Sequence, residues 1–180
     1  MKQMRNLSGR ELRWVQPRAF RCSYELRDGE EVVATLQSAQ NSSSAVVFES
    51  ADGRWTFRRA GFWVPQTIVF DSSERAIARF HPNFWYPGGT LDIEGAGTLK
   101  AKSNFSMSRL DFRDGDVEPV IRCERFRGIF HRGSITRIAP PAAGRGELPW
   151  LVGLAWHLAL KMQDEAGAAA GAAAAVAASG

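Results

Sequence analysis

The stretch that decides the fold is residues 147–163, which read ELPWLVGLAWHLALKMQ. Pro149 stands where the first turn of a helix tolerates proline, and Lys161 stands where a helix C-terminus favours a cation. Large apolar side chains occupy every side of the helical wheel, and only His157 and Lys161, four residues apart, form a polar line. A helix that is apolar all round must be surrounded by protein or by lipid.

The length of this stretch separates the two environments. Leu148 to Leu160 covers 13 residues, which is about 20 Å of helix, whereas the hydrocarbon core of a bilayer requires about 20 residues and roughly 30 Å. We therefore predict a helix over 148–162 that is buried in protein, and no transmembrane segment.

The chain before this helix alternates apolar and polar residues with a period of two. Phe20, Cys22, Tyr24 and Leu26, for example, are separated by polar or charged residues, which is typical of a strand with one face in water. Turn signals such as Asp28-Gly29 separate such runs, and the longest irregular stretch between strands is 81–89. About twelve strands are predicted, near 12–16, 19–27, 30–37, 43–50, 54–60, 64–70, 75–81, 89–93, 98–105, 107–113, 118–124 and 128–138.

Short sequential strands without crossover helices indicate an antiparallel sandwich or barrel. An eight-stranded barrel fills its interior with its own side chains, and sixteen or more strands leave a lumen. A barrel of about twelve strands needs a filler, and a helix about 10 Å across fits that space. The predicted fold is therefore mainly β, a closed antiparallel barrel of about twelve strands around a buried hydrophobic C-terminal helix.

The ends of the chain differ from its middle. Residues 1–11 are polar and basic and are predicted to form a flexible arm, and the barrel with its helix is expected over 12–163. The Ala/Gly-rich segment 164–180 has nothing large to bury and is predicted to be a disordered tail. The N-terminus has no apolar run typical of a secretory signal, which favours a cytoplasmic location.

The net charge and the cysteine content indicate which classes of binding partner and site the chain could have. The 180 residues carry 23 Lys and Arg against 19 Asp and Glu, a net charge of +4. A moderate positive charge favours anionic partners and also keeps a protein soluble. The two cysteines, Cys22 and Cys123, form no metal-ligand spacing, and a buried free thiol is expected for each.

Motifs for catalysis or cofactors are missing from the sequence. The histidines, His81, His131 and His157, belong to no zinc-protease or serine-hydrolase signature. We interpret His157 as a hydrogen-bonded histidine near a barrel mouth. Asp111, Asp114 and Asp116 lack the spacing of a calcium loop and are interpreted as a hairpin turn. No catalytic residue, metal or cofactor is predicted.

The segment SADGRWTFRRAGFWVP at 50–65, the strands up to about residue 138 and the helix ELPWLVGLAWHLALKM resemble the tubby C-terminal-like group. That group includes the tubby domain, phospholipid scramblases and LURP-one-related proteins. The resemblance covers about 12–163 and implies a closed twelve-stranded barrel around a central C-terminal helix. Tubby domains bind phosphoinositides through a basic pocket, and no residue of that pocket is carried over to this chain.

Basic side chains on two predicted strands are the candidate anion-binding residues: Arg54, Arg58, Arg59, Lys100 and Lys102. Charges at alternate positions line one face of a strand and can bind phosphates. Aromatic residues that could lie at a membrane interface are Trp55, Phe62, Trp63, Trp85 and Tyr86, although packing in the core or within loops is the preferred interpretation of them.

The preferred function is a non-enzymatic barrel that binds anionic phospholipid headgroups or acts as a protein-interaction scaffold. A nucleic-acid-binding module and an enzyme whose polar residues meet only in three dimensions are the alternatives. The positive charge is compatible with nucleic-acid binding, and polar residues that are far apart in the sequence could meet in an enzyme site.

Overall fold

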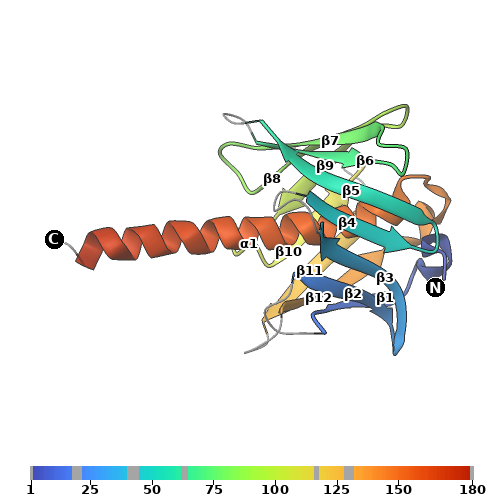
Figure 1. Cartoon of the computed structure of the whole chain (residues 1–180), viewed down its shortest axis with the longest axis horizontal. Helices are drawn as coiled ribbons and strands as arrows, with labels where there is room; N and C mark the ends of the chain where they lie inside the picture. The colour runs from blue at the N-terminus through green and yellow to red at the C-terminus, as the bar shows by residue number, and fades with distance from the viewer. Residues whose placement is uncertain are drawn as a thin grey trace.

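The structure is a computed structural model that describes residues 2–17, 22–39, 45–61, 65–115, 118–127 and 132–178. Twelve strands and a C-terminal helix make up the fold, together with two short 3₁₀ helices (Figure 1). The elements are η1 (Met4–Leu7), β1 (Glu11–Val15), β2 (Ser23–Asp28), β3 (Glu31–Ser38), β4 (Ala45–Ser50), β5 (Gly53–Ala60), β6 (Gln66–Phe70), β7 (Ala76–Pro82), β8 (Gly88–Ile93), β9 (Gly97–Ser103), β10 (Arg109–Arg113), β11 (Ile121–Arg127), β12 (Arg132–Ile138), η2 (Pro140–Gly144) and α1 (Leu148–Ala178).

The strands form one closed antiparallel barrel, as the sequence predicts. Each strand pairs with its neighbour in the chain, and β1 closes the ring by pairing with β12, with Leu12 opposite Thr136. Closure leaves no free strand edge among the described residues. Residues 19–21, 43–44, 64 and 128–131 of four predicted strands lie outside the described part of the chain.

The helix α1 lies inside the barrel over its first thirteen residues, which confirms the buried-helix prediction. Trp150, Leu151, Leu154 and Trp156 are buried among the inward faces of the strands. The Trp156 indole stacks on that of Trp14 of β1, with ring centroids 6.0 Å apart. The inward-facing side chains and the helix therefore share one hydrophobic core.

The prediction of a flexible arm over 1–11 is wrong for residues 4–7. These residues form η1, in which Met4 and Leu7 are completely buried. The Met4 backbone N–H donates to Asp52 Oδ2 at 2.8 Å, and η1 packs against η2 near the start of α1. Two apolar side chains in a polar segment are enough to cover this end of the barrel, which we call the closed end. Strand β1 then begins at Glu11.

The prediction of a disordered tail over 164–180 also differs from the structure. The helix does not end near residue 162 but continues to Ala178, and Figure 1 shows this extension projecting away from the barrel. Alanine has the highest intrinsic helix propensity, so the segment propagates the helix already formed inside the barrel. The barrel end from which α1 emerges is opposite the closed end, and we call it the open rim.

Candidate functional site

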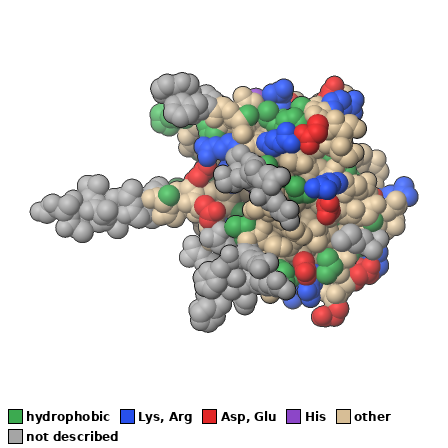
Figure 2. Space-filling model, viewed as in Figure 1, with side chains coloured by type: hydrophobic (Ala, Val, Ile, Leu, Met, Phe, Trp, Pro, Cys, Tyr) green, Lys and Arg blue, Asp and Glu red, His purple; other side chains and the backbone are tan. Residues whose placement is uncertain are grey.

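The three predicted arginines of β5 do not share one face. Phe57 and Trp55 pack toward the core, and Arg59 has the same parity, which places it inward at the mouth of the barrel. Arg54 and Arg58 lie on the outer face, where Arg54 pairs with Glu49 at 3.4 Å and Arg58 pairs with Glu74. Figure 2 shows basic and acidic side chains intermingled on this side of the molecule.

Lys100 and Lys102 lie on the outer face of β9 and are exposed. Strands β6, β7 and β8 separate them from β5 in the closed barrel. The five candidate cations therefore do not converge: they divide into an outer pair on β5, an outer pair on β9, and Arg59 at the mouth. Alternation along a strand identifies a face, but the strand order decides which faces are neighbours.

Exposed aromatic side chains gather on the open rim. Phe84 is 90% exposed, Trp85 82%, Tyr86 77% and Phe105 97%. The first three lie on the loop between β7 and β8, and Phe105 lies on the loop between β9 and β10. We call these four residues the rim aromatics. Most large apolar side chains of a folded domain are covered, so four this exposed on two adjoining loops are unusual.

Backbone contacts hold the two rim loops together. The Ser103 N–H donates to the Pro87 carbonyl at 3.2 Å, which joins the end of β9 to the neighbouring loop. Gly88 permits the close approach of these chains, because a Cβ on it would lie 2.3 Å from the Ala101 carbonyl oxygen. The irregular stretch predicted over 81–89 corresponds to this loop, at residues 83–87 between β7 and β8.

The sequence pattern misplaced Phe105 and said nothing of Phe84. Alternation with Leu99 and Ala101 predicted a strand over 98–105, but β9 ends at Ser103. The Asn104 side chain ends it, because its Oδ1 accepts the backbone N–H groups of Ser108 and Arg109 at 2.9 and 3.0 Å and folds a turn. Asn104 with Ser106 and Ser108 nearby is a sequence signal for a turn, and it could have shown that the strand ends before Phe105.

The other predicted interfacial aromatics have three outcomes. Trp85 and Tyr86 are exposed, as an interfacial role requires. Trp55 instead packs against the core beside Phe48, with ring centroids 5.9 Å apart. Phe62 and Trp63 lie outside the described residues.

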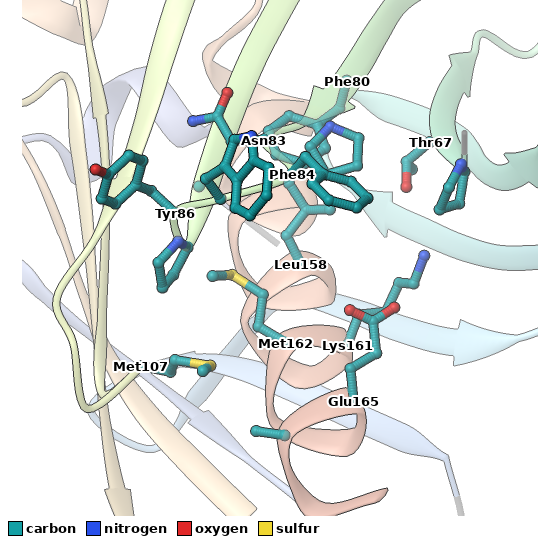
Figure 3. A pocket seen from close by; sticks show the side chains of 16 residues that line it. Thr67, Phe80, Asn83, Phe84, Tyr86, Met107, Leu158, Lys161, Met162 and Glu165 are labelled. Atoms are coloured by element: carbon teal, nitrogen blue, oxygen red, sulfur yellow. The ribbon is translucent and has the colours of Figure 1, made fainter. Parts of the chain in front are cut away.

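A cavity of about 310 Å³ opens between the β7–β8 loop and α1 at the rim. Figure 3 shows Leu158 and Met162 of the helix on one side of it and Phe80 and Phe84 on the other. Its lining also includes Lys161, Glu165 and Thr67. We call this space the mouth cavity. Its walls are mainly apolar, and its charged groups come from one face of the helix.

Lys161 is the partly buried cation of the mouth cavity. Burial lowers the pKa of its amine below the ordinary value, the nearby positive charge of Arg59 lowers it further, and Glu165 acts in the opposite direction. In Figure 3 the Lys161 amine points into the cavity on the side of Thr67. The arrangement favours a negative group beside this amine, because such a group would offset both burial and repulsion.

His157 lies one helical turn before Lys161 and lines a smaller cavity of about 150 Å³ with Cys22 and Asp164. Its imidazole packs against the Phe57 ring, 5.7 Å between centroids. Burial, assisted by the charge of Lys161, lowers the pKa of His157 to about 3, which keeps the ring neutral near pH 7. Its location near the barrel mouth agrees with the sequence interpretation, whereas the hydrogen bond in that interpretation stays a prediction.

The remaining histidines and the two cysteines do not gather into one site among the described residues. His81 pairs with Asp92 at 3.4 Å on the barrel surface, and His131 lies outside the described residues. Cys22 and Cys123 are both free thiols; the prediction of burial is confirmed for Cys123, whose pKa burial raises to about 11, and is wrong for Cys22, which is exposed. Within the described ranges, no three His, Cys, Asp or Glu side chains gather as metal ligands would.

Asp111 has a role that the turn interpretation missed. Its side chain faces outward from β10 yet is only 2% exposed, because three arginines cover it. Arg122 donates two hydrogen bonds to it, at 3.0 and 3.2 Å, and Arg113 donates a third at 3.2 Å. Asp116 lies outside the described residues. One carboxylate thus holds the outer faces of β10 and β11 together.

Comparisons with known proteins found no match: neither a family model, nor a curated protein, nor a solved structure is significantly similar to this chain. In the part of the chain that the structure describes, no helix has both the length and the apolar character needed to cross a bilayer.

Proposed function

We propose that the protein attaches to anionic membrane surfaces through its open rim. The observation that carries this proposal is the exposure of Phe84, Trp85, Tyr86 and Phe105 together on two adjoining loops. Tryptophan and tyrosine favour the boundary between hydrocarbon and water because each has an apolar ring and a polar group. Each of these side chains would lose much of its contact with water at such a boundary.

Cations near the same rim favour anionic over neutral lipid. Lys102 lies opposite Gly88, at the base of the aromatic loop, and Arg109 begins the strand that follows Phe105. Both are exposed. A lysine or arginine near an anionic bilayer contributes about 1 kcal/mol to binding, and salt screens this contribution. Of the four outer-face cations chosen from the sequence, Lys102 is therefore the candidate headgroup ligand.

We also propose that the chain is related to the tubby-like group. A closed barrel around a C-terminal helix is the architecture that the tubby-like resemblance implies, and it supports placing this chain near that group. The rim aromatics, rather than a tubby-type pocket, are the basis for membrane attachment here. A cytoplasmic location is part of the same proposal.

Sedimentation with lipid vesicles tests the proposal. We expect binding to vesicles of phosphatidylcholine with phosphatidylserine, weaker binding to phosphatidylcholine alone, and loss of the difference at high salt. Burying a phenylalanine side chain contributes about 1.5–3 kcal/mol, so Phe105→Ser should weaken vesicle binding by roughly tenfold or more. Lys102→Glu should weaken binding only to the anionic vesicles.

The matched controls are Lys100→Glu, two residues away on the same face of β9, and Asp92→Asn on the outer face of β8. The vesicle affinity of both control variants should be closer to that of the unchanged protein than the affinity of Lys102→Glu is. Thermal unfolding of each variant separates loss of binding from loss of fold. Membrane attachment would be refuted if the protein bound neither kind of vesicle. It would also be refuted if Phe105→Ser bound vesicles as tightly as the unchanged protein does. In that case a salt-sensitive shift of DNA would favour the nucleic-acid alternative.

A further inference from the structure

The mouth cavity combines an apolar interior with one cation at a defined place. Leu158 and Met162 come from the helix, Phe80 and Thr67 from strands, and Phe84 from the rim loop. The volume of about 310 Å³ is roughly twice that of an engineered ~150 Å³ cavity that binds benzene. By that scale it has room for an apolar chain on the order of ten to twelve carbons.

The charged side chains around the cavity decide which charge the head group of such a ligand should carry. Lys161 is partly buried in the wall, Arg59 lies near enough to act on it, and Glu165 is the opposing acidic group on the next turn of the helix. Lys161 and Glu165 are the charged groups of the cavity wall, and Asp164 lines the neighbouring cavity together with Lys161. The Lys161 amine lies where water is partly excluded, and Arg59 is a second positive charge near it. A carboxylate or phosphate beside the Lys161 amine would form a charge-assisted hydrogen bond, whereas a cationic head would be repelled.

We propose that the mouth cavity binds a single-chain lipid with an anionic head, the chain between Leu158, Met162 and Phe80 and the head at Lys161. This ligand site goes beyond membrane attachment, because it requires no bilayer. Phe84, Trp85 and Tyr86 belong to both surfaces, whereas Phe105 is no part of the cavity wall. Variants at Phe105 therefore separate the two proposals.

Titration calorimetry with twelve-carbon ligands below their micelle concentrations tests the site. Dodecanoate represents a free fatty acid, and lysophosphatidic acid with the same chain represents a lipid released from a bilayer. We expect binding of at least one of them, and the tighter one identifies the source. Dodecyltrimethylammonium should bind at least tenfold more weakly, because its head is cationic. Equal binding of anionic and cationic ligands would overturn the proposal.

Two kinds of variant test the assigned contacts. Lys161→Met should weaken binding of the anionic ligand about tenfold or more and leave dodecanol within about threefold, since only the anionic head forms a charge-assisted hydrogen bond with the amine. Lys100→Met removes the same charge from the outer face and should have no effect. Met162→Trp should abolish binding of every chain by filling the cavity. Met107→Trp fills it from the β9–β10 loop, without disturbing the packed helix.

The outcome of these variants is decisive in both directions. Unchanged dodecanoate affinity in a folded Met107→Trp or Met162→Trp protein would place the ligand elsewhere and refute the site. Phe105→Ser should lower vesicle binding while leaving dodecanoate affinity unchanged. If vesicle binding fails but the anionic chain still binds in the cavity, the proposed membrane function falls and the ligand site stands.

Discussion

Gly153 of α1 faces the ring of Phe48 on β4 so closely that a Cβ on this glycine would lie 2.5 Å from two ring carbons. Gly153 is buried in the first half of the helix. The glycine thus brings the helix backbone against a large aromatic side chain of the barrel wall. A close fit of this kind makes the helix an integral part of the core.

Gly153→Ala therefore tests how the helix is packed. In an isolated helix this change stabilises by up to about 1 kcal/mol. Inside the barrel it forces Phe48 to move, and we expect the free energy of unfolding to fall by about 1–3 kcal/mol. Urea unfolding measures the change. Gly167→Ala is the matched control, because nothing lies within 4 Å of a Cβ there, and it should be neutral or stabilising. Stabilisation by both substitutions would contradict the packing.

The closed end provides a second test, through η1. Leu7 is completely buried although its neighbours in the sequence are polar. Leu7→Ala should lower the free energy of unfolding by about 2–5 kcal/mol, the usual cost of truncating a buried leucine. Arg5→Ala, at an exposed position of the same short helix, should change stability by less than about 0.5 kcal/mol. If residues 4–7 were a flexible arm, chemical denaturation would instead give equally small changes in unfolding free energy for Leu7→Ala and Arg5→Ala.

His157 gives the fold a specific response to acid. Its pKa is lowered from 6.5 to about 3 in the folded protein, so below pH 6.5 the unfolded chain takes up a proton that the folded chain does not. Stability from this group is complete above pH 6.5 and is lost as the pH falls toward 3. Between pH 7 and pH 5 the loss approaches about 2 kcal/mol, at 1.36 kcal/mol per unit.

His157→Gln should therefore reduce the difference in unfolding free energy between pH 7 and pH 5 by up to about 2 kcal/mol. Gly167→Ala, which changes no titratable group and meets nothing within 4 Å of its added Cβ, is the control and should retain the full difference. Denaturant titrations at the two pH values give both numbers. An unchanged pH difference in His157→Gln would mean that this imidazole titrates normally in the folded state.

Asp111 is expected to stabilise the outer faces of β10 and β11. In Asp111→Asn the charge that Arg109, Arg113 and Arg122 surround is removed, and the guanidinium groups repel one another. Because these arginines are partly exposed and can turn toward water, we expect a loss of about 2–4 kcal/mol, at the lower end of that for a broken buried pair.

Salt dependence distinguishes this mechanism from simple loss of packing. Repulsion among the three arginines is screened by salt, so the deficit of Asp111→Asn should shrink in 1 M NaCl. Asp92→Asn changes an exposed carboxylate on β8 and should cost less than about 0.5 kcal/mol. A deficit that is independent of salt would assign the effect to hydrogen bonding alone.

Much of the fold follows from local patterns. The alternation around Tyr24 and Leu26 predicts a strand, and both side chains are buried on one face of β2. The apolar residues on all sides of the helix predict burial, and Trp150 and Trp156 are buried. Such patterns work because a strand or helix has a fixed period, and any residue in it is assigned a face by counting along the chain.

The candidate site was far less predictable. Consecutive residues of a strand point to opposite sides, so Arg58 and Arg59 separate even though they are adjacent in the sequence. Phe105 fits the alternation of β9 and yet is exposed, because Asn104 turns the chain first. At Leu7 an isolated apolar residue in a polar segment gave no periodic signal, although it is buried.

Sequence alone determined that this chain builds twelve short strands and a buried apolar helix, because alternation, turn residues and helix length act over a few residues. Only the tertiary structure decided which charges become neighbours, which aromatic side chains remain in water and where a cavity opens beside Lys161. Those features depend on closure of β1 against β12, where Glu11 lies opposite Arg137. Closure joins residues from opposite ends of the barrel sequence, at distances along the chain that no local period encodes.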